Sequence, residues 1–326
     1  MIELKHSKFL LVAAAVCSTT AVFAASIPGY PTRPIRLLLP FAPGGSADVI
    51  GRIIAPKLSE AMGQQWVVDN RGGAAGNIAA EIVARAAPDG HTVFLGLSTV
   101  VTANPALYKL SFSMEKDLQA VTMLTISQYI LVLNPGVPAA NVEELIALAK
   151  QKPRSLNYSS GGVGTPLHLA AALFQKRAGI EMVHVPYKSG GASAAAVLSG
   201  ETQFSVSSIA SALQLVKAGR LRAIATTGSQ RSQLAPDLPT LVESGFPGLE
   251  VSSWYGLLVP SGTSTAIVQR IRNEAIKAVQ APDVLRALAA QGLQVETSTP
   301  QEFAARIRLD TKTWAEVIKS AGIKAE

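Results

Sequence analysis

Two glycine-rich turns constrain this chain more than any other feature, because each joins a strand-like segment to a helix-like one. The first turn lies within residues 37–48 and the second within residues 156–166. A turn of this kind leaves backbone N–H groups unpaired at a helix N-terminus, where the helix dipole adds partial positive charge. Each turn is therefore a candidate anion site. Two such turns in one chain predict two lobes that hold one anionic ligand between them.

Strand and helix patterns alternate along most of the sequence. Short apolar runs of strand length occur at residues 35–40, 65–69, 92–97, 156–158, 182–185, 203–206 and 221–226. Segments with apolar residues at helical spacing separate these runs, as at residues 46–62 and 165–178. Strands that alternate with crossover helices form parallel, doubly wound sheets, so the expected fold class is α/β.

Two extended segments are longer than the others and are expected to cross between the lobes as hinges. They lie near residues 121–133 and 251–259. This placement predicts a discontinuous first lobe, made of residues 26–127 plus 253–326. The second lobe is then the insert at residues 128–252, and each lobe is expected to contain a doubly wound sheet.

The first 24 residues have the composition of a signal peptide. A basic start precedes an apolar run at residues 9–16, which is too short to span a bilayer. A signal-peptidase site ends at Ala24, so we expect export to a bacterial periplasm and a mature chain that begins just after it. Cys17 offers a lipoprotein alternative, which is disfavoured because Val16 stands where a small residue is required.

Charge and cysteine content narrow the classes of partner. The chain has a formal net charge of +7. An excess of basic over acidic residues favours the binding of acidic small molecules through long-range attraction. The lysines and arginines form no cluster with interleaved aromatic residues, which disfavours nucleic-acid binding. Cys17 is the only cysteine and lies inside the expected signal peptide, so the mature chain would have no disulfide and no thiolate metal site.

The sequence lacks several motifs that are typical of enzymes, and this disfavours an enzyme. An exported α/β hydrolase would need a nucleophile, a base and an orienting acid, and the chain contains no Gly-x-Ser-x-Gly elbow. It also contains no phosphate-binding Walker sequence and no dinucleotide fingerprint. The three histidines after the signal have no metal-type partner at helical spacing. We therefore expect no catalytic residue, no metal and no cofactor, and we keep the hydrolase as an alternative.

Several short motifs occur in a fixed order along the mature chain. They include Phe41-Ala42-Pro43-Gly44-Gly45, Asn70-Arg71-Gly72-Gly73, Tyr158-Ser159-Ser160-Gly161-Gly162, Val185-Pro186-Tyr187-Lys188 and Trp254-Tyr255-Gly256-Leu257. Together and in this order, the motifs resemble those of the Bug receptors, the periplasmic substrate-binding proteins of tripartite tricarboxylate transport. The resemblance covers essentially the whole mature sequence. It implies a two-lobed periplasmic-binding-protein (Venus flytrap, type II-like) fold that holds a carboxylate largely through backbone N–H groups, small hydroxyls and ordered water.

The expected ligand-binding residues lie on the two turns and near the ends of strands. They are Ala42, Pro43, Gly44, Gly45, Asp48, Ser98, Thr102 and Asn104 in the first lobe, and Ser159, Ser160, Gly161, Gly164, Thr165, His168, Tyr187 and Ser207 in the second. Asp48 either orients its loop or contacts a ligand amine. Thr165 also suits a helix N-cap, and His168 either contacts ligand or fills the cleft wall.

One position departs from the family pattern. Ser207 stands where many relatives of this family carry Asp or Asn, so the preferred carboxylate of a particular relative does not transfer to this chain. The resemblance implies a membrane partner, either the permease of a tripartite transporter or a sensor kinase that reads the closed form. The receptor is expected to be a monomer.

Overall fold

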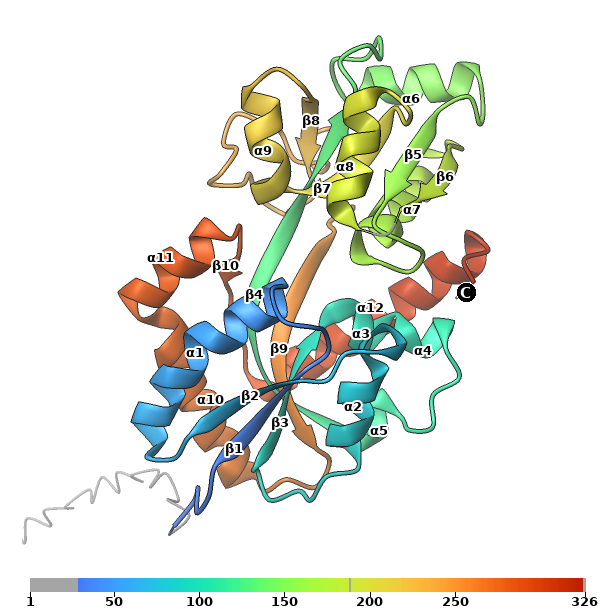
Figure 1. The fold of residues 1–326 in the computed structure, drawn as a ribbon. Coiled ribbons are helices and arrows are strands. Elements are labelled where there is room, and N and C mark those ends of the chain that lie inside the picture. Colours follow the sequence, from blue (N-terminus) through green and yellow to red (C-terminus); the bar gives the residue numbers. More distant parts are fainter. Residues whose placement is uncertain (1–28, 188, 325–326) are drawn as a thin grey trace, which may run out of the picture.

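The computed structural model describes residues 29–187 and 189–324. Its helices and strands form two groups, one above the other in Figure 1, which are joined by two long strands. The predicted signal peptide, residues 1–24, lies outside the described residues, as do the first residues of the predicted first lobe. Within the described part of the chain, no helix is long and apolar enough to cross a membrane.

The lower group is built on three parallel strands in the order β2-β1-β3. These strands are β1 (Ile35–Leu39), β2 (Trp66–Asn70) and β3 (Thr92–Leu97). The helices of this group are α1 (Ser46–Met62), the 3₁₀ turn η1 (Ala74–Gly76), α2 (Asn77–Ala84), α3 (Ser98–Thr102), α4 (Asn104–Leu107), α5 (Met114–Asp117), α10 (Thr265–Gln280), α11 (Pro282–Ala290) and α12 (Pro300–Ser320). Helix α1 follows the predicted range because Ile50, Ile54 and Leu58 form one fully buried stripe.

The upper group is likewise built on three parallel strands. Its parallel strands are β5 (Asn157–Ser160), β6 (Val183–Pro186) and β7 (Phe204–Ser208). Its helices are α6 (Val142–Gln151), α7 (Pro166–Ala178), α8 (Gly190–Ser199) and α9 (Ile209–Lys217), and β8 (Arg222–Thr226) lies beside them.

Two antiparallel strands connect the groups, β4 (Leu118–Leu133) and β9 (Ser252–Pro260). They pair from Leu118 opposite Pro260 to Gln128 opposite Ser252. Beyond this point β4 continues into the upper group, where one edge pairs with β7 and the other with β8. Figure 1 shows β4 in green and β9 in orange passing between the groups. The segments near residues 121–133 and 251–259 lie on these strands, and their role as hinges stays a prediction.

The α/β fold class is confirmed, but the sheets are mixed rather than purely parallel. Strands β4 and β9 run antiparallel to their neighbours, and the short strand β10 (Gln294–Val295) also pairs antiparallel with β4. The reason is topological. A strand that carries the chain from one group to the other enters the second sheet from the opposite direction.

Helix α12 packs against both groups. Near its start, Phe303 meets the indole of Trp254 edge-on at 4.8 Å between ring centroids. Asp310 then accepts a 2.7 Å hydrogen bond from Nε1 of Trp254, which is fully buried on β9. The last turns contribute Trp314 and Val317 to the same apolar cluster as the upper group. The C-terminal helix therefore connects the groups instead of serving the lower one alone, and the predicted lobe boundaries stay a proposal.

Candidate functional site

The first glycine-rich turn joins β1 to α1 on the side of the lower group that faces the upper group (Figure 1). Residues 42–46 are exposed. Gly44 has φ of +97°, a left-handed conformation that favours glycine. The N-cap of α1 is Gly45, and no side chain among the described residues caps this end of the helix. The N–H groups at the start of α1 are thus available to an anion.

Asp48 lies in the first turn of α1 and is nearly buried. Its Oδ2 accepts a 3.1 Å hydrogen bond from the Gly44 N–H, and Arg52 Nε donates to the same carboxylate at 2.9 and 3.0 Å. The Arg52 hydrogen bond holds the pKa of Asp48 below its ordinary value, although burial opposes this, and the Gly44 N–H adds to the lowering. The carboxylate is therefore engaged with its own loop, which favours loop orientation over contact with a ligand amine.

Ser98 and Thr102 lie on α3, directly after β3. The Thr102 hydroxyl is fully buried and donates to the Ser98 carbonyl at 2.7 Å. The Ser98 hydroxyl is 2.9 Å from that of Ser253 on β9. Of these two predicted site residues, Ser98 is thus the one whose side chain reaches the crossing strands.

Asn104, on α4, supports a second loop of the lower group. Its Nδ2 donates to the Ala75 carbonyl at 3.0 Å and to Asn77 Oδ1 at 2.7 Å. Ala74 and Ala75 have φ of +45° and +55°, which non-glycine residues adopt only when their surroundings hold them there. Asn104 is one such support, so its contacts favour a positioning role over direct ligand contact.

In the second glycine-rich turn, the predicted hydroxyl groups bond mainly within the loop. Ser160 Oγ donates to the Gly162 carbonyl at 3.1 Å and accepts from the Gly162 N–H at 3.2 Å. Thr165 Oγ1 donates to the same carbonyl at 2.8 Å and caps α7 by accepting from the His168 N–H. Ser159 is buried and donates to the Ser193 carbonyl at 3.0 Å. These bonds fix the conformation of the loop.

Two stacked imidazoles support this loop from one side. The rings of His168 and His184 are 3.8 Å apart between centroids and nearly parallel. His168 Nδ1 accepts from the Gly164 N–H at 3.1 Å, and His184 Nε2 is 2.7 Å from Ser160 Oγ. Burial lowers the pKa of His168 to about 3 and that of His184 to about 4, so both rings are neutral near pH 7. These contacts favour a structural role for His168 over ligand contact, and its role stays a prediction.

The glycines of the second turn allow close approach to neighbouring backbone. A Cβ on Gly161 would lie 3.0 Å from the backbone N of Gly190, the first residue of α8. A Cβ on Gly164 would lie 3.0 Å from Leu107 of α4, so this loop reaches the lower group. Because Gly161 abuts the start of α8, that helix N-terminus joins the candidate site, although the sequence motifs did not single out its glycines.

Tyr187 and Ser207 lie beside the second turn. The Tyr187 N–H donates to the Ser160 carbonyl at 2.9 Å. Its hydroxyl is buried without a hydrogen-bond partner among the described residues, and burial, with Glu201 beside it, raises its pKa. Ser207 is buried on β7, where its hydroxyl is 3.0 Å from that of Ser205. Neither side chain bonds to the loop itself.

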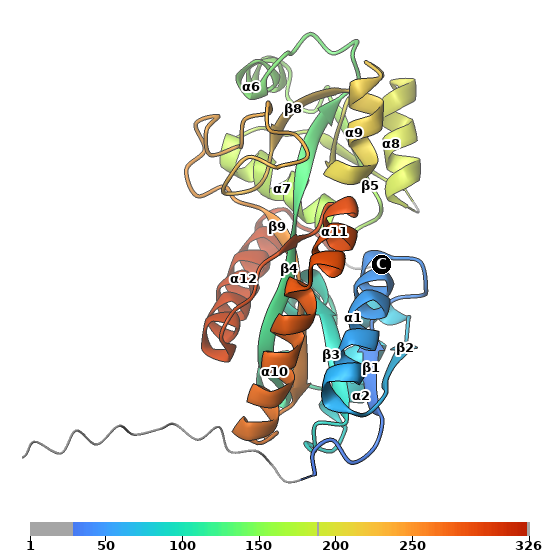
Figure 2. The same cartoon turned by 90° about the vertical axis from the view of Figure 1, so that its left-hand side faces the viewer.

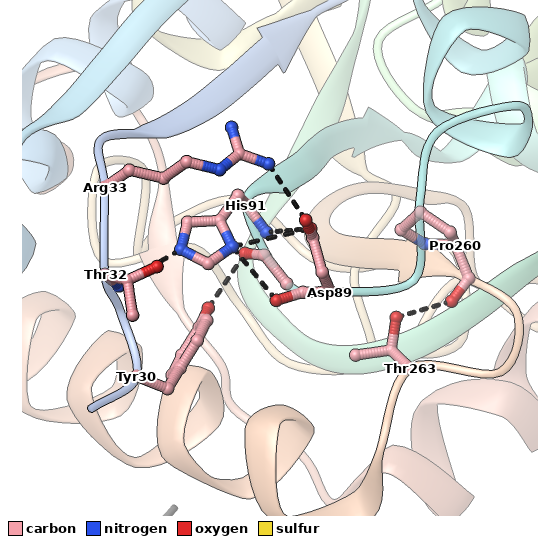
Figure 3. Close-up of polar contacts among 8 residues, drawn as sticks. Tyr30, Thr32, Arg33, Asp89, His91, Pro260 and Thr263 are labelled. Atoms are coloured by element: carbon pink, nitrogen blue, oxygen red, sulfur yellow. Dashed lines mark hydrogen bonds and ion pairs between the residues drawn. The ribbon is translucent and has the colours of Figure 1, made fainter. Parts of the chain in front are cut away.

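The third histidine within residues 29–324, His91, belongs to a separate polar cluster (Figure 3). His91 precedes β3, at the opposite end of that strand from α3. Its Nε2 accepts from the Thr32 N–H at 3.3 Å, while Asp89 accepts from the His91 N–H and from Arg33, both at 2.9 Å. The Tyr30 hydroxyl donates to the Gly90 carbonyl at 2.8 Å. These contacts attach the start of the described chain to the sheet.

Comparisons with known proteins agree with this architecture. Residues 50–323 match the model of the tripartite tricarboxylate transporter family receptor. The chain is 33% identical to protein BugT of Bordetella pertussis, over 97% of this chain and 98% of that protein. It is 31% identical to Rpa4515 of R. palustris, solved with adipate, with a TM-score of 0.76 over 90% of this chain and 99% of that one.

A second solved structure is MatC (Rpa3494) from Rhodopseudomonas palustris with bound malate. It is 29% identical, with a TM-score of 0.73 over 89% of this chain and all of that one. The resemblance of the sequence motifs to the Bug receptors is thereby confirmed. The family consists of substrate-binding receptors rather than enzymes. The chain belongs to the tripartite tricarboxylate transporter receptor family, the group of periplasmic solute-binding proteins to which the Bug receptors belong.

Proposed function

We propose that this protein is a periplasmic receptor that captures a small carboxylate between its two lobes and delivers it to a tripartite tricarboxylate-type transporter. The observation that carries the proposal is the uncapped N-terminus of α1, which opens with residues 42–46 toward the upper group. A carboxylate there would accept hydrogen bonds from backbone N–H groups and gain from the helix dipole.

The second half of the proposed site is the loop at residues 161–165 with the N-terminus of α8. The N–H groups of Gly162 and Gly164 already donate to Ser160 and His168, so the part of this loop proposed to meet a ligand is the backbone around Gly161, beside the start of α8. The receptors solved with adipate and with malate are similar to this chain along most of its length, which supports a carboxylate as the ligand. The net charge of +7 also favours an anion.

The proposed mechanism is ligand-driven closure. A carboxylate that binds both loops is bound more tightly when the lobes are close, so it shifts the population toward the closed form. Closure brings parts of both lobes into one composite surface, which the membrane partner would recognise. In this proposal the leader peptide, residues 1–24, is cleaved on export.

A thermal-shift panel of mono-, di- and tricarboxylates tests the proposal. A cognate ligand at a hundredfold excess over its Kd should stabilise the protein by about 2.7 kcal/mol. For a chain of this size, that free energy raises the Tm by roughly 5 °C. If no carboxylate stabilises the protein and it instead hydrolyses an ester or amide, the exported hydrolase is the correct class.

A further inference from the structure

A cavity in the lower group lies between α12 and the segment that runs from α3 to α5. We call it the α12 cavity. Its volume is about 600 Å³, which is in the range of small-molecule binding sites. Apolar side chains make up most of its lining, chiefly Val101, Leu110, Phe112, Met114 and Ile307. Val101 and Met114 belong to the core of the lower group, so the cavity reaches from this core to the surface.

Short side chains on α12 leave this space open. Ile307, Thr311 and Ala315 recur every four residues, so they form one stripe along the helix, and all three line the cavity. Thr311 Oγ1 donates to the Ile307 carbonyl at 2.8 Å, which satisfies its hydroxyl within the helix. In the segment before α5, Ser113 Oγ accepts from the Lys116 N–H at 3.2 Å. Because these two hydroxyls are already bonded, the walls present mainly carbon atoms to a ligand.

The mouth of the α12 cavity is basic. Arg308 and Lys312 lie one turn apart on α12, line the cavity and are exposed. Within residues 29–187 and 189–324, neither side chain forms an ion pair or a hydrogen bond, whereas Arg306 of the same helix pairs with Asp310 at 2.8 Å. Glu115 of α5 is the acidic residue among those that line the cavity, and it is exposed. The two cations outnumber it, so the mouth favours an anion.

The α12 cavity is separate from the candidate carboxylate site. None of the residues that line it belongs to either glycine-rich turn. Figure 2 shows α12 on one side of the crossing strands and α1 on the other. A ligand in this cavity would leave the start of α1 free. Sequence motifs missed the cavity because its walls come from segments about 200 residues apart, near residues 101–115 and 307–315.

We propose that the α12 cavity is a second ligand site, for an acid that has one anionic head and an alkyl or aromatic body. The guanidinium of Arg308 can donate two parallel N–H bonds to a carboxylate, and the Lys312 ammonium adds a second positive charge. The body of the acid would displace water from the apolar walls.

The two parts of such a ligand contribute unequally. Ion pairs between exposed side chains and a ligand head are weak, because water screens the charges. Burial of the body stabilises the complex by an amount that grows with every methylene group removed from water. The chain length should therefore set most of the affinity, while the charged mouth selects the sign of the head.

Calorimetric titration of Gly44→Val, in which the first glycine-rich turn is blocked, with octanoate tests the proposal. Octanoate should bind this variant as tightly as it binds the wild type. Butyrate has the same head and a shorter chain, and should bind the variant at least about tenfold more weakly. Octyltrimethylammonium has the same chain and a positive head, and should also bind at least about tenfold more weakly.

Substitutions in the lining locate the binding. Ala315→Phe fills part of the cavity from the surface of α12 and should lower octanoate affinity at least about tenfold, because packed side chains leave no room for the chain. Arg308→Gln with Lys312→Gln should lower it about three- to tenfold. Glu115→Gln removes the acid and should not weaken binding. The matched control is Arg177→Gln with Lys319→Gln, which removes the same charge from exposed residues outside the cavity and should leave the affinity unchanged.

The inference is overturned if octanoate binds no more tightly than butyrate, or if Ala315→Phe keeps the wild-type affinity and Tm. It is also overturned if the Arg308 and Lys312 double variant binds octanoate as its control does. Octanoate binding that Gly44→Val abolishes would place the acid in the cleft between the lobes instead. A dimer in sedimentation that Ala315→Phe dissociates would place a second copy of the chain in the cavity. Each of these results would leave the proposed function standing, because that function depends on the glycine-rich turns.

Discussion

Replacing Gly44 with valine is expected to lower carboxylate affinity at least about 100-fold while the protein still folds. A valine side chain would occupy the open space before the start of α1, where no other atom lies within 4 Å of the new Cβ. It would also disfavour the φ of +97° that directs the turn, and so displace the N–H donors. Hydrogen bonds to a charged group contribute about 1.5–3 kcal/mol each, so the loss of two accounts for this factor.

Gly63→Val is the matched control, because Gly63 lies at the other end of the same helix. It has φ of +71°, is exposed, and likewise has no atom within 4 Å of an added Cβ. Both substitutions should cost about 1–3 kcal/mol of folding free energy through backbone strain. Calorimetric titration should then show wild-type affinity for Gly63→Val alone. Retained affinity in Gly44→Val would remove the first turn from the site.

The stacked histidines are expected to make the upper group sensitive to acid. The folded protein holds His168 at a pKa of about 3 and His184 at about 4, both below the ordinary 6.5, because burial disfavours the charged ring. The unfolded chain therefore takes up protons first as the pH falls through 6.5. The stabilising contribution is complete above about pH 6.5 and decreases below it, by up to about 1.4 kcal/mol per pH unit for each histidine.

Urea unfolding at pH 7.5, 6 and 5 checks this prediction. The double variant His168→Asn and His184→Gln keeps polar atoms near the positions that bond Gly164 and Ser160, and neither new side chain titrates. Its free energy of unfolding should vary less between pH 7.5 and 5 than that of the wild type. An equally steep dependence in the double variant would show that other groups cause the acid sensitivity.

Much of this fold could be predicted from the spacing of apolar residues along the sequence and from the residues typical of turns. Helix α1 begins and ends at the predicted residues because its apolar stripe and its flanking glycines agree. Strand direction could not be predicted, because an apolar run such as residues 251–259 has the same pattern in a parallel and in an antiparallel sheet. The mixed sheet therefore depends on the crossing topology, which only the assembled structure contains.

The sequence was enough to predict which backbone turns form the candidate site, but it was not enough to predict the role of each polar side chain. Glycine patterns identified both turns, since positive φ at Gly44 and Gly164 is a local property of the chain. The partners of a polar side chain depend on distant segments. Asn104 bonds to a loop near residue 75, and Ser98 bonds to Ser253, which is remote in sequence. Residue type alone could not separate side chains that face a ligand from those that support a loop.

The most direct measurement is an NMR titration of the protein labelled with ¹⁵N-glycine, using the carboxylate that stabilises it most. If both turns bind one ligand, the amide signals of Gly44 and Gly45 and those of Gly161 and Gly164 should shift together, with a single midpoint. Shifts confined to one turn, or two separate midpoints, would contradict a shared carboxylate site between the lobes.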